Sequence, residues 1–169
     1  MAKILYIDPK YCIACRACEV ACEREHEGLN HIEVYVVEEA KASIPYTCRH
    51  CESAPCVAVC PTKALYRTDS GVFVNYLRCI GCRQCIVACP FGIPKFIESL
   101  KVVVKCDLCR HRLMKNYMPA CVSTCPTGAI SYVEEAEIAK LKRVAEVTKI
   151  IEAIKASKTL TSGVVAHAH

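Results

Sequence analysis

The sequence predicts an α+β fold of short strands, tight turns and short helical segments, followed by one long C-terminal helix. Cysteine accounts for 16 of the 169 residues, whereas tryptophan is absent and only 7 % of residues are aromatic. Residues 134–169 contain no cysteine at all. The length suits one domain or two very small ones. With so few large side chains, something other than hydrophobic packing must stabilise the cysteine-rich part.

Short apolar runs bounded by turn residues predict the strands of the cysteine-rich part. We expect them at residues 3–7, 32–37, 64–68, 72–75, 101–104 and 129–133. The segment Asp69-Ser70-Gly71 predicts a hairpin turn between the third and the fourth strand. Short helical turns are expected after the third cysteine of each cysteine group.

Residues 134–158 predict one helix, because they are rich in Glu, Ala, Lys and Ile and contain neither Pro nor Gly. At about 1.5 Å per residue the helix is about 37 Å long. Apolar residues at steps of three or four form one stripe. The stripe consists of Ile138, Leu141, Val144, Val147, Ile151 and Ile154. We expect its far half to dock a partner subunit or a second copy of this chain; the alternative is that it packs against the cysteine-rich part.

The N-terminal sequence MAKILYIDP suggests a strand that runs into a turn, without a charged n-region and an apolar h-region. No run approaches 18 uninterrupted apolar residues, so no direct membrane insertion is expected. We therefore expect a cytoplasmic protein. Thiols stay reduced in that compartment, so clustered cysteines indicate metal ligands rather than disulfides.

The cysteines fall into four groups of four, with none left over. The first and third groups have the spacing C-x2-C-x2-C-x3-C, the second has C-x2-C-x4-C-x3-C, and the fourth has a longer middle gap. The groups are Cys12, Cys15, Cys18 and Cys22; Cys48, Cys51, Cys56 and Cys60; Cys79, Cys82, Cys85 and Cys89; and Cys106, Cys109, Cys121 and Cys125. The last three groups end in Cys-Pro, and proline turns the chain away from the helical turn that carries the cysteine.

This spacing indicates iron–sulfur clusters. The run C-x2-C-x2-C-x3-C-P is the ligand pattern of bacterial two-cluster ferredoxins, in which the fourth cysteine ligates the other cluster. Zinc is the alternative, but a structural zinc ion usually takes two separated cysteine pairs without a third cysteine close by. Four oxidised [4Fe-4S] clusters with their thiolates would carry about −8, which turns the formal charge of +5 into about −3. The basic residues are then explained without a nucleic-acid partner, and none is expected.

Several segments resemble those of the four-cluster ferredoxin-like electron-transfer subunits. They are CRHCESAPCVAVCPT at 48–62, CIGCRQCIVACPFG at 79–92, KCDLC at 105–109 and PACVSTCPTG at 119–128. The resemblance covers about residues 3–133. Members of that family accompany dimethyl sulfoxide and polysulfide reductases, formate dehydrogenases and formate-linked hydrogenases, carbon monoxide dehydrogenase and tungsten aldehyde oxidoreductases. The chain is similar to the compact members, since it lacks the larger insertions of the membrane-linked ones.

The resemblance implies two nested two-cluster ferredoxin-like units related by a pseudo-two-fold axis. The domain at 1–133 would hold an inner unit, 46–92, and an outer unit, 1–45 with 93–133, while 134–169 would serve assembly. The resemblance also implies that each closing cysteine crosses to the other site of its unit. The implied sets are Cys12, Cys15, Cys18 and Cys125; Cys106, Cys109, Cys121 and Cys22; Cys48, Cys51, Cys56 and Cys89; and Cys79, Cys82, Cys85 and Cys60.

The same resemblance implies electron transfer without catalysis. The sequence shows no nucleophile with a paired base, no phosphate-binding loop and no flavin or nicotinamide motif. We expect a subunit with four [4Fe-4S] clusters that wires electrons to or from a molybdenum or tungsten enzyme, such as aldehyde oxidoreductase or formate dehydrogenase. A ferredoxin partner of carbon monoxide dehydrogenase or hydrogenase, a freely diffusing polyferredoxin and a zinc-rich interaction module are the alternatives. Filament-forming family members use similar extensions, which leaves self-association or a filament through 134–158 open.

The basic residues beside the cysteines could have either of two roles, and the sequence does not decide between them. Their charge either raises cluster potentials or docks an acidic partner, or it merely balances the thiolates on a solvated face. The residues are Arg16, Arg49, Arg78, Arg83, Lys105 and Arg110. His50 and His111 lie inside cysteine groups, but every group already has four cysteines, so neither is expected to be a ligand.

Overall fold

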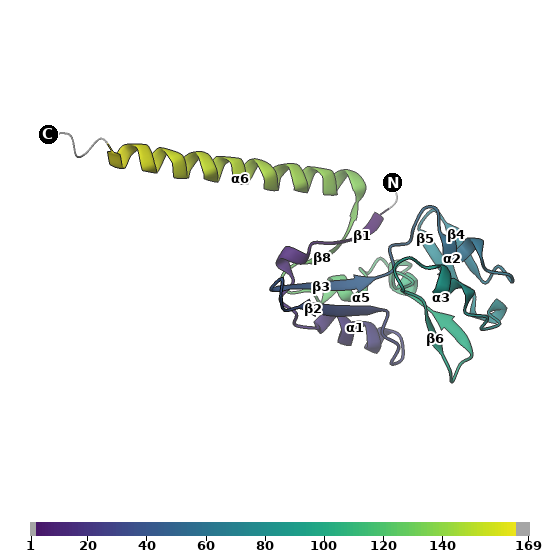
Figure 1. Ribbon diagram of the computed structural model, residues 1–169. Coiled ribbons are helices and arrows are strands. Elements are labelled where there is room, and N and C mark those ends of the chain that lie inside the picture. The colour runs from purple at the N-terminus through teal and green to yellow at the C-terminus, as the bar shows by residue number, and fades with distance from the viewer. Residues whose placement is uncertain (1–2, 165–169) are drawn as a thin grey trace. The chain divides into compact units, whose positions relative to one another are not determined.

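The computed structural model describes residues 3–164, with side chains described up to residue 155. The chain divides into two compact units, one of residues 2–132 and the other beginning at Val133. We call the first the cysteine-rich body and the second the C-terminal unit. Short strands and short helices alternate in the body, and the C-terminal unit contains one long helix, so the predicted α+β class is confirmed (Figure 1).

The elements of the body are all short. They are β1 (Lys3–Ile7), η1 (Pro9–Tyr11), α1 (Ala17–Glu25), β2 (Ile32–Val37), β3 (Ala42–Thr47), α2 (Pro55–Ala58), β4 (Leu65–Thr68), β5 (Gly71–Val74), η2 (Tyr76–Arg78), α3 (Gln84–Ala88), β6 (Lys95–Ile97), β7 (Val102–Val104), α4 (Arg110–Leu113), α5 (Ala120–Ser123) and β8 (Ile130–Glu134). As expected, α2, α3 and α5 each carry the third cysteine of a group near their start, and α1 carries Cys18 in the same way.

The described strands form four two-stranded sheets. Three of them are antiparallel hairpins, β2–β3, β4–β5 and β6–β7, whose registers pair Ile32 with Thr47, Leu65 with Val74 and Lys95 with Val104. The fourth sheet joins β1 to β8, which come from the two ends of the body. The first and last strands of the body therefore lie side by side, and all its other elements come between them in the sequence.

Six strands lie within one residue of the predicted bounds, and β3 and β6 were not predicted. Pro45 interrupts the apolar pattern of β3, and proline is tolerated only where no ladder hydrogen bond is needed, as at the edge of a two-stranded sheet. β6 has three residues, which is too short for alternation to be detected.

The body has two small hydrophobic cores, and cysteines belong to both. One consists of Cys18, Cys22, Ile32, Val34, Cys121 and Ile130. The other consists of Cys60, Ala64, Leu65, Val72, Cys85 and Val103. Helix α1 packs against α5 in the first core, and α2 packs against α3 in the second. Figure 1 shows α1 beside the β2–β3 hairpin, which it also contacts.

Identical local structures precede the first and third cysteine groups. Asp8 caps η1 by accepting a hydrogen bond from the backbone N–H of Lys10, and Asn75 caps η2 by accepting one from Leu77, both at 3.1 Å. After each capped turn comes a residue in the left-handed conformation, Arg16 or Arg83, at the start of α1 or α3. The internal repeat is thus structural as well as a repeat of cysteine spacing.

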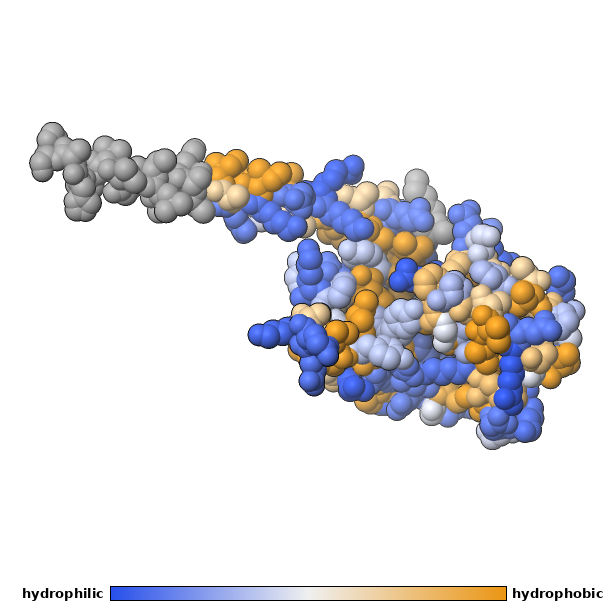
Figure 2. Space-filling model, viewed as in Figure 1, coloured by the Kyte–Doolittle hydropathy of each residue, from blue (hydrophilic) through white to orange (hydrophobic). Residues whose placement is uncertain are grey.

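The C-terminal unit is dominated by α6 (Glu135–Val164). The helix extends six residues beyond the predicted end, because no proline or glycine interrupts it before Gly163. Ile138 is buried, whereas the rest of the described stripe is exposed, with Val144 at 57 % and Ile151 at 45 %. Figure 2 shows hydrophobic surface along this helix. None of the described helices is long and apolar enough to cross a membrane.

Candidate metal centres

The structure gathers the 16 cysteines around four cavities. Site I is lined by Cys12, Cys15, Cys18 and Cys125; site II by Cys22, Cys106, Cys109 and Cys121; site III by Cys48, Cys51, Cys56 and Cys89; and site IV by Cys60, Cys79, Cys82 and Cys85. The cavity volumes are similar, about 290, 310, 380 and 340 Å³ in that order. Four similar cavities, each with four thiols, suit four copies of the same group.

Each cavity takes three cysteines from one group and the fourth from another. Cys18 and Cys22 show how one helix supplies two sites. They are four residues apart in α1 and both buried, yet Cys18 lines site I and Cys22 lines site II. One helical turn is about 5.4 Å, which is enough for neighbouring side chains on one helix face to meet different groups.

Backbone N–H groups point at several of the thiols. His31 donates to Cys22 Sγ at 3.3 Å, Leu108 to Cys106 Sγ at 3.4 Å and His50 to Cys48 Sγ at 3.5 Å. Leu108 and His50 have positive φ values of 59° and 48°, which turn these N–H groups inward. Such donors stabilise negative charge on sulfur, as ligands of a metal centre require.

Burial makes several of these thiols hard to ionise without a metal. It raises the pKa of Cys18, Cys22, Cys85, Cys106 and Cys109 to about 11 each, and that of Cys121 further still. A thiol with such a pKa is protonated at neutral pH, whereas a metal ligand is a thiolate. These buried thiols therefore need bound cations in order to ionise.

The closing cysteines of two groups behave differently. Burial works against ionisation at Cys60 and Cys125, but backbone N–H groups and the hydroxyls of Thr62 and Thr127 outweigh it and lower both pKa values. Each hydroxyl belongs to the Thr of a Cys-Pro-Thr run, 3.8 and 3.7 Å from the sulfur. The same tripeptide therefore stabilises a thiolate in two sites.

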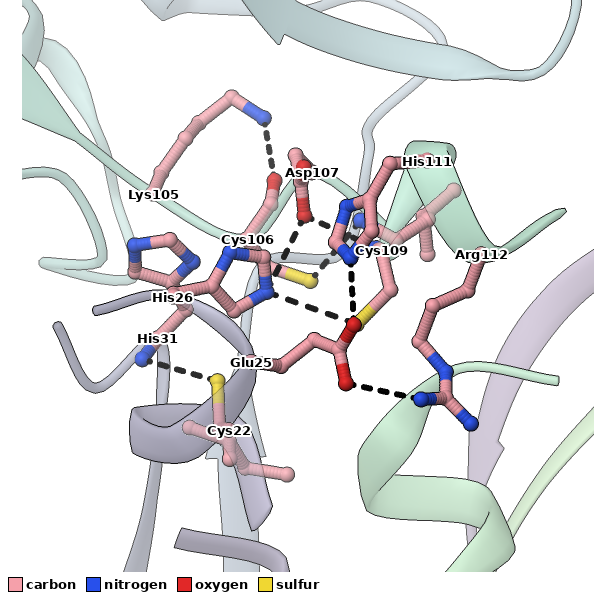
Figure 3. Close-up of polar contacts among 12 residues, drawn as sticks. Cys22, Glu25, His26, His31, Lys105, Cys106, Asp107, Cys109, His111 and Arg112 are labelled. Carbon is pink, nitrogen blue, oxygen red and sulfur yellow. Dashed lines mark hydrogen bonds and ion pairs between the residues drawn. The ribbon is translucent and has the colours of Figure 1, made fainter. Parts of the chain in front are cut away.

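Two histidines, His26 and His31, line site II, and His111 lies close to His26 (Figure 3). His26 Nε2 lies 3.5 Å from Cys109 Sγ and 3.5 Å from Asp107 Oδ1, and its ring lies 4.5 Å from that of His31. His111 Nε2 contacts Glu25 Oε1 at 2.6 Å, and Arg112 donates to the other oxygen of Glu25 at 2.8 Å. Two sets of polar contacts thus join the end of α1 to α4 and the residues just before it, and the rings of His26 and His111 lie 5.7 Å apart between them.

His26 and His31 were missed by the sequence-based prediction, which considered only the histidines inside cysteine groups. Burial lowers the pKa of both rings, to about 4 for His31. Both ring nitrogens of His31 are buried and have no hydrogen-bond partner among the described residues. His26 follows Cys22 by four residues and directly follows the last residue of α1, and that spacing was the available signal.

The two histidines considered earlier have other partners. His50 Nδ1 accepts the backbone N–H of Val72 at 3.1 Å, and burial lowers the pKa of this ring to about 3. His111 pairs with Glu25 as described above. Neither ring lines one of the four cavities.

Most of the basic residues that flank the cysteines engage neighbours within the chain. Arg83 pairs with Glu98 at 2.8 Å and lies over the ring of Phe96. Arg16 pairs with Glu19 at 3.3 Å, Arg49 lies over Phe91, and Arg110 lies over Phe73. Arg78 is exposed, whereas Lys105 is buried beside site III.

The donor sets fit [4Fe-4S] clusters better than zinc ions. Each site offers four sulfurs, which either metal accepts. However, His31 turns two unpartnered ring nitrogens into the wall of site II, and Lys105 brings a cation to site III. The inorganic sulfides of a [4Fe-4S] cluster would offer acceptors to the ring N–H of His31, whereas a Zn²⁺ ion brings no acceptor; with four thiolates either group would be anionic beside Lys105.

Comparison with protein-family models gives two matches. Residues 39–135, more than half of the chain, match a 4Fe-4S dicluster domain, and residues 9–25 match a 4Fe-4S binding domain. The two matches together span all four cysteine groups.

Three relatives show the range of similar proteins. The thiosulfate reductase electron transfer subunit PhsB of Salmonella typhi is 40 % identical over 150 residues, which are 80 % of this chain and 78 % of the relative. Formate hydrogenlyase subunit 2 of Escherichia coli (strain K12) is 33 % identical over 186 residues, with 88 % and 90 % covered. The electron transport protein HydN of the same strain is 34 % identical over 166 residues, with 83 % and 93 % covered.

Proposed function

Because this chain belongs to the 4Fe-4S ferredoxin-like family of electron-transfer proteins, we propose that it carries four [4Fe-4S] clusters and conducts electrons to or from a separate catalytic subunit. The observation that carries the proposal is the gathering of all 16 cysteines into four cavities of four. Bound clusters would supply reversible one-electron transfer. The chain's own residues hold, space and insulate them.

The order of the sites follows from the segments that they share. Cys18 and Cys22 of α1 line sites I and II. Lys105 of site III directly precedes Cys106 of site II, and Cys85 and Cys89 line sites IV and III.

The electrostatic influence of one thiol on another agrees with this order. Burial raises the pKa of Cys121 in site II most, and thiolates of its own site and then Cys18 of site I raise it further. Burial likewise raises the pKa of Cys106 in site II, and Cys48 of site III adds to the rise. Cys85 of site IV is raised by burial and then by Cys56 of site III among others. The proposed path therefore runs I–II–III–IV.

The two ends of this path lie at the surface. Of the 16 cysteines, all of which are among the described residues, Cys15 and Cys82 are the exposed ones, and they belong to sites I and IV. Close to Cys82 in the sequence, Leu77 is 98 % exposed and Val87 is 90 % exposed. These two ends are the places where the chain would exchange electrons with other proteins, because none of the cysteines of sites II and III is exposed.

The catalytic partner is proposed from the relatives. The relatives include a thiosulfate reductase subunit and a formate hydrogenlyase subunit, and the resemblance of the sequence ranks molybdenum or tungsten enzymes first. Carbon monoxide dehydrogenase or hydrogenase is the second choice. A freely diffusing polyferredoxin in the cytoplasm is the remaining candidate, favoured by the name of HydN, an electron transport protein.

Metal and sulfide analysis of the anaerobically purified chain tests the cluster proposal. We expect about 16 iron and about 16 sulfide per chain, with a brown colour. About half as much iron in a fully loaded sample would contradict the assignment of four clusters. Zinc without sulfide would contradict the whole proposal and favour an interaction module.

Anaerobic isolation from the source organism, with mass spectrometry of the co-eluting proteins, tests the partner. A molybdenum, tungsten or hydrogenase subunit that co-elutes in constant ratio to this chain would support its role as the electron-transfer subunit of an enzyme complex. If the chain elutes alone with its clusters intact, it is a diffusible carrier. Turnover of a substrate by the isolated chain would contradict the non-catalytic role.

A further inference from the structure

Lys105 is a buried lysine without a buried acid to neutralise it. The side chain follows β7 directly and is only 3 % exposed. Its ammonium donates hydrogen bonds to the backbone carbonyls of Val72 and Cys106, the latter at 2.9 Å (Figure 3). In the described part of the chain no carboxylate lies within ion-pair distance of it.

This ammonium group stands between two of the cysteine sites. Lys105 lines site III, and it holds the carbonyl of Cys106, whose sulfur lines site II. The ammonium therefore adjoins site III directly and site II through the backbone of one of its cysteines. The lysine is therefore an electrostatic neighbour of both inner sites of the path.

Burying an ammonium ion is costly unless negative charge compensates it. Two carbonyl dipoles solvate this one, but they do not neutralise it. A [4Fe-4S] cluster with four thiolates is anionic and becomes more so on reduction. An anionic group in site III and another in site II would supply the missing counter-charge from two sides, and the added electron would be stabilised in either.

We propose that Lys105 is a buried cation shared by sites II and III, and that its charge makes the clusters in both sites easier to reduce. This inference rests on the proposed function, because it requires clusters in these two sites. One residue would then raise the reduction potentials of both clusters that take part in the central step, the transfer between sites II and III. Lys105 lines neither site I nor site IV, so the potentials of those two sites should stay unchanged.

Potentiometric titration of the full chain, followed by electron paramagnetic resonance, tests the proposal on Lys105→Met. The signals are first assigned to sites with variants that each lack one ligand, such as Cys109→Ser for site II and Cys51→Ser for site III. At a fixed potential we expect the ratio of reduced to oxidised cluster to fall at least tenfold in sites II and III. For one electron this corresponds to a shift of about 59 mV.

Two control variants separate charge from other effects. Lys105→Gln keeps a donor for the two carbonyls but loses the charge, so it should shift sites II and III in the same direction. Lys101→Met removes a lysine four residues earlier that is 77 % exposed and pairs with Glu98, and it should leave sites II and III unchanged. Sites I and IV should stay unchanged in both Lys105 variants.

The outcomes distinguish this inference from the proposed function. Unchanged potentials in a fully loaded Lys105→Met, or normal potentials in Lys105→Gln, would overturn the inference and leave the four-cluster proposal standing. Loss of iron from sites II and III in both variants would also overturn it, because Lys105 would then serve cluster binding. If the unaltered chain lacks about 16 iron, the proposed function fails before the variants are compared.

Discussion

At the scale of single residues, Cys22 shows how a spacing of four decides which site a ligand joins. It lies one helical turn after Cys18 in α1, but it lines site II with cysteines more than 80 positions away. The N–H of His31 at 3.3 Å stabilises negative charge on its sulfur. The spacing of the group indicated that its last cysteine differs from the others, and the structure shows where that cysteine goes.

Replacing Cys22 by serine should damage site II and leave sites III and IV intact. The reason is that Cys22 lines the same cavity as Cys106, Cys109 and Cys121. Iron analysis and electron paramagnetic resonance are the measurements, with loss of at most about four of about 16 irons expected. Cys109→Ser should remove the same signal, and Cys15→Ser a different one. Loss of a signal from site III or IV in Cys22→Ser would contradict the assignment.

Gly71→Ala should destabilise the β4–β5 hairpin. A Cβ at Gly71 would lie 2.7 Å from His50 Nδ1, which accepts the Val72 N–H, and the φ of +143° does not suit alanine. We expect a loss of about 1–3 kcal/mol of unfolding free energy, measured anaerobically from thermal or denaturant unfolding. Gly28→Ala is the matched control: Gly28 also has positive φ, but a Cβ there meets nothing within 4 Å. Equal effects would show that contact with His50 is unimportant.

At the scale of elements, α6 carries an apolar stripe that is exposed from Leu141 to Ile154, whereas Ile138 is buried. Leu141, Val144, Val147, Ile151 and Ile154 are each 45–57 % exposed. Helices of globular proteins usually bury such a stripe. The sequence predicted the helix and the stripe, and docking of a partner subunit or of a second copy stays a prediction.

Val147→Glu together with Ile151→Glu should disrupt assembly without loss of iron. Two charges in the middle of the stripe would oppose its burial in an interface. Size-exclusion chromatography with light scattering measures assembly, and iron analysis measures cluster content. Lys140→Glu, at an exposed position of the same helix, should change neither. Loss of iron in the double variant would instead support packing of this stripe against the cysteine-rich body.

At the scale of the whole molecule, the cysteine-rich body has little hydrophobic core, and the bound metal should supply much of its folding energy. Its two hydrophobic cores are small, and cysteines belong to both of them. Metal binding and folding are coupled in small domains of this kind. Removing the metal with a chelator should therefore unfold the body.

Release of iron should become faster as the pH falls. Burial raises the pKa of thiols such as Cys106 and Cys109 to about 11, so protons bind them strongly and compete with iron for the thiolate. Fewer thiolates are available to bind iron at lower pH, so the stability of the metal-bound folded state decreases as the pH decreases. Absorbance of a coloured iron chelator, followed at several pH values between about 5 and 9, measures the rate. A rate that does not depend on pH would contradict this account.

The sequence by itself determined the local features of this protein. Cysteine spacing is a covalent property, so the four groups, the third cysteine at the start of each short helix and the kind of cofactor followed from it. The long helix followed from the composition of 134–158, because propensity and the absence of breakers act along the chain. Strands β3 and β6 were missed, since Pro45 and a length of three residues hide any alternation.

Only the tertiary structure decided what depends on contacts between distant segments. It brings His26, which follows α1, to 3.5 Å from Cys109, 83 positions away, and buries Lys105 against Val72 of β5. It also shows that Cys15 and Cys82 are the exposed thiols. These features arise from burial and from electrostatics between side chains that meet only when β1 has paired with β8 and the hairpins have formed. No local pattern encodes them, because the energy of such a contact depends on its surroundings and not on its neighbours in the chain.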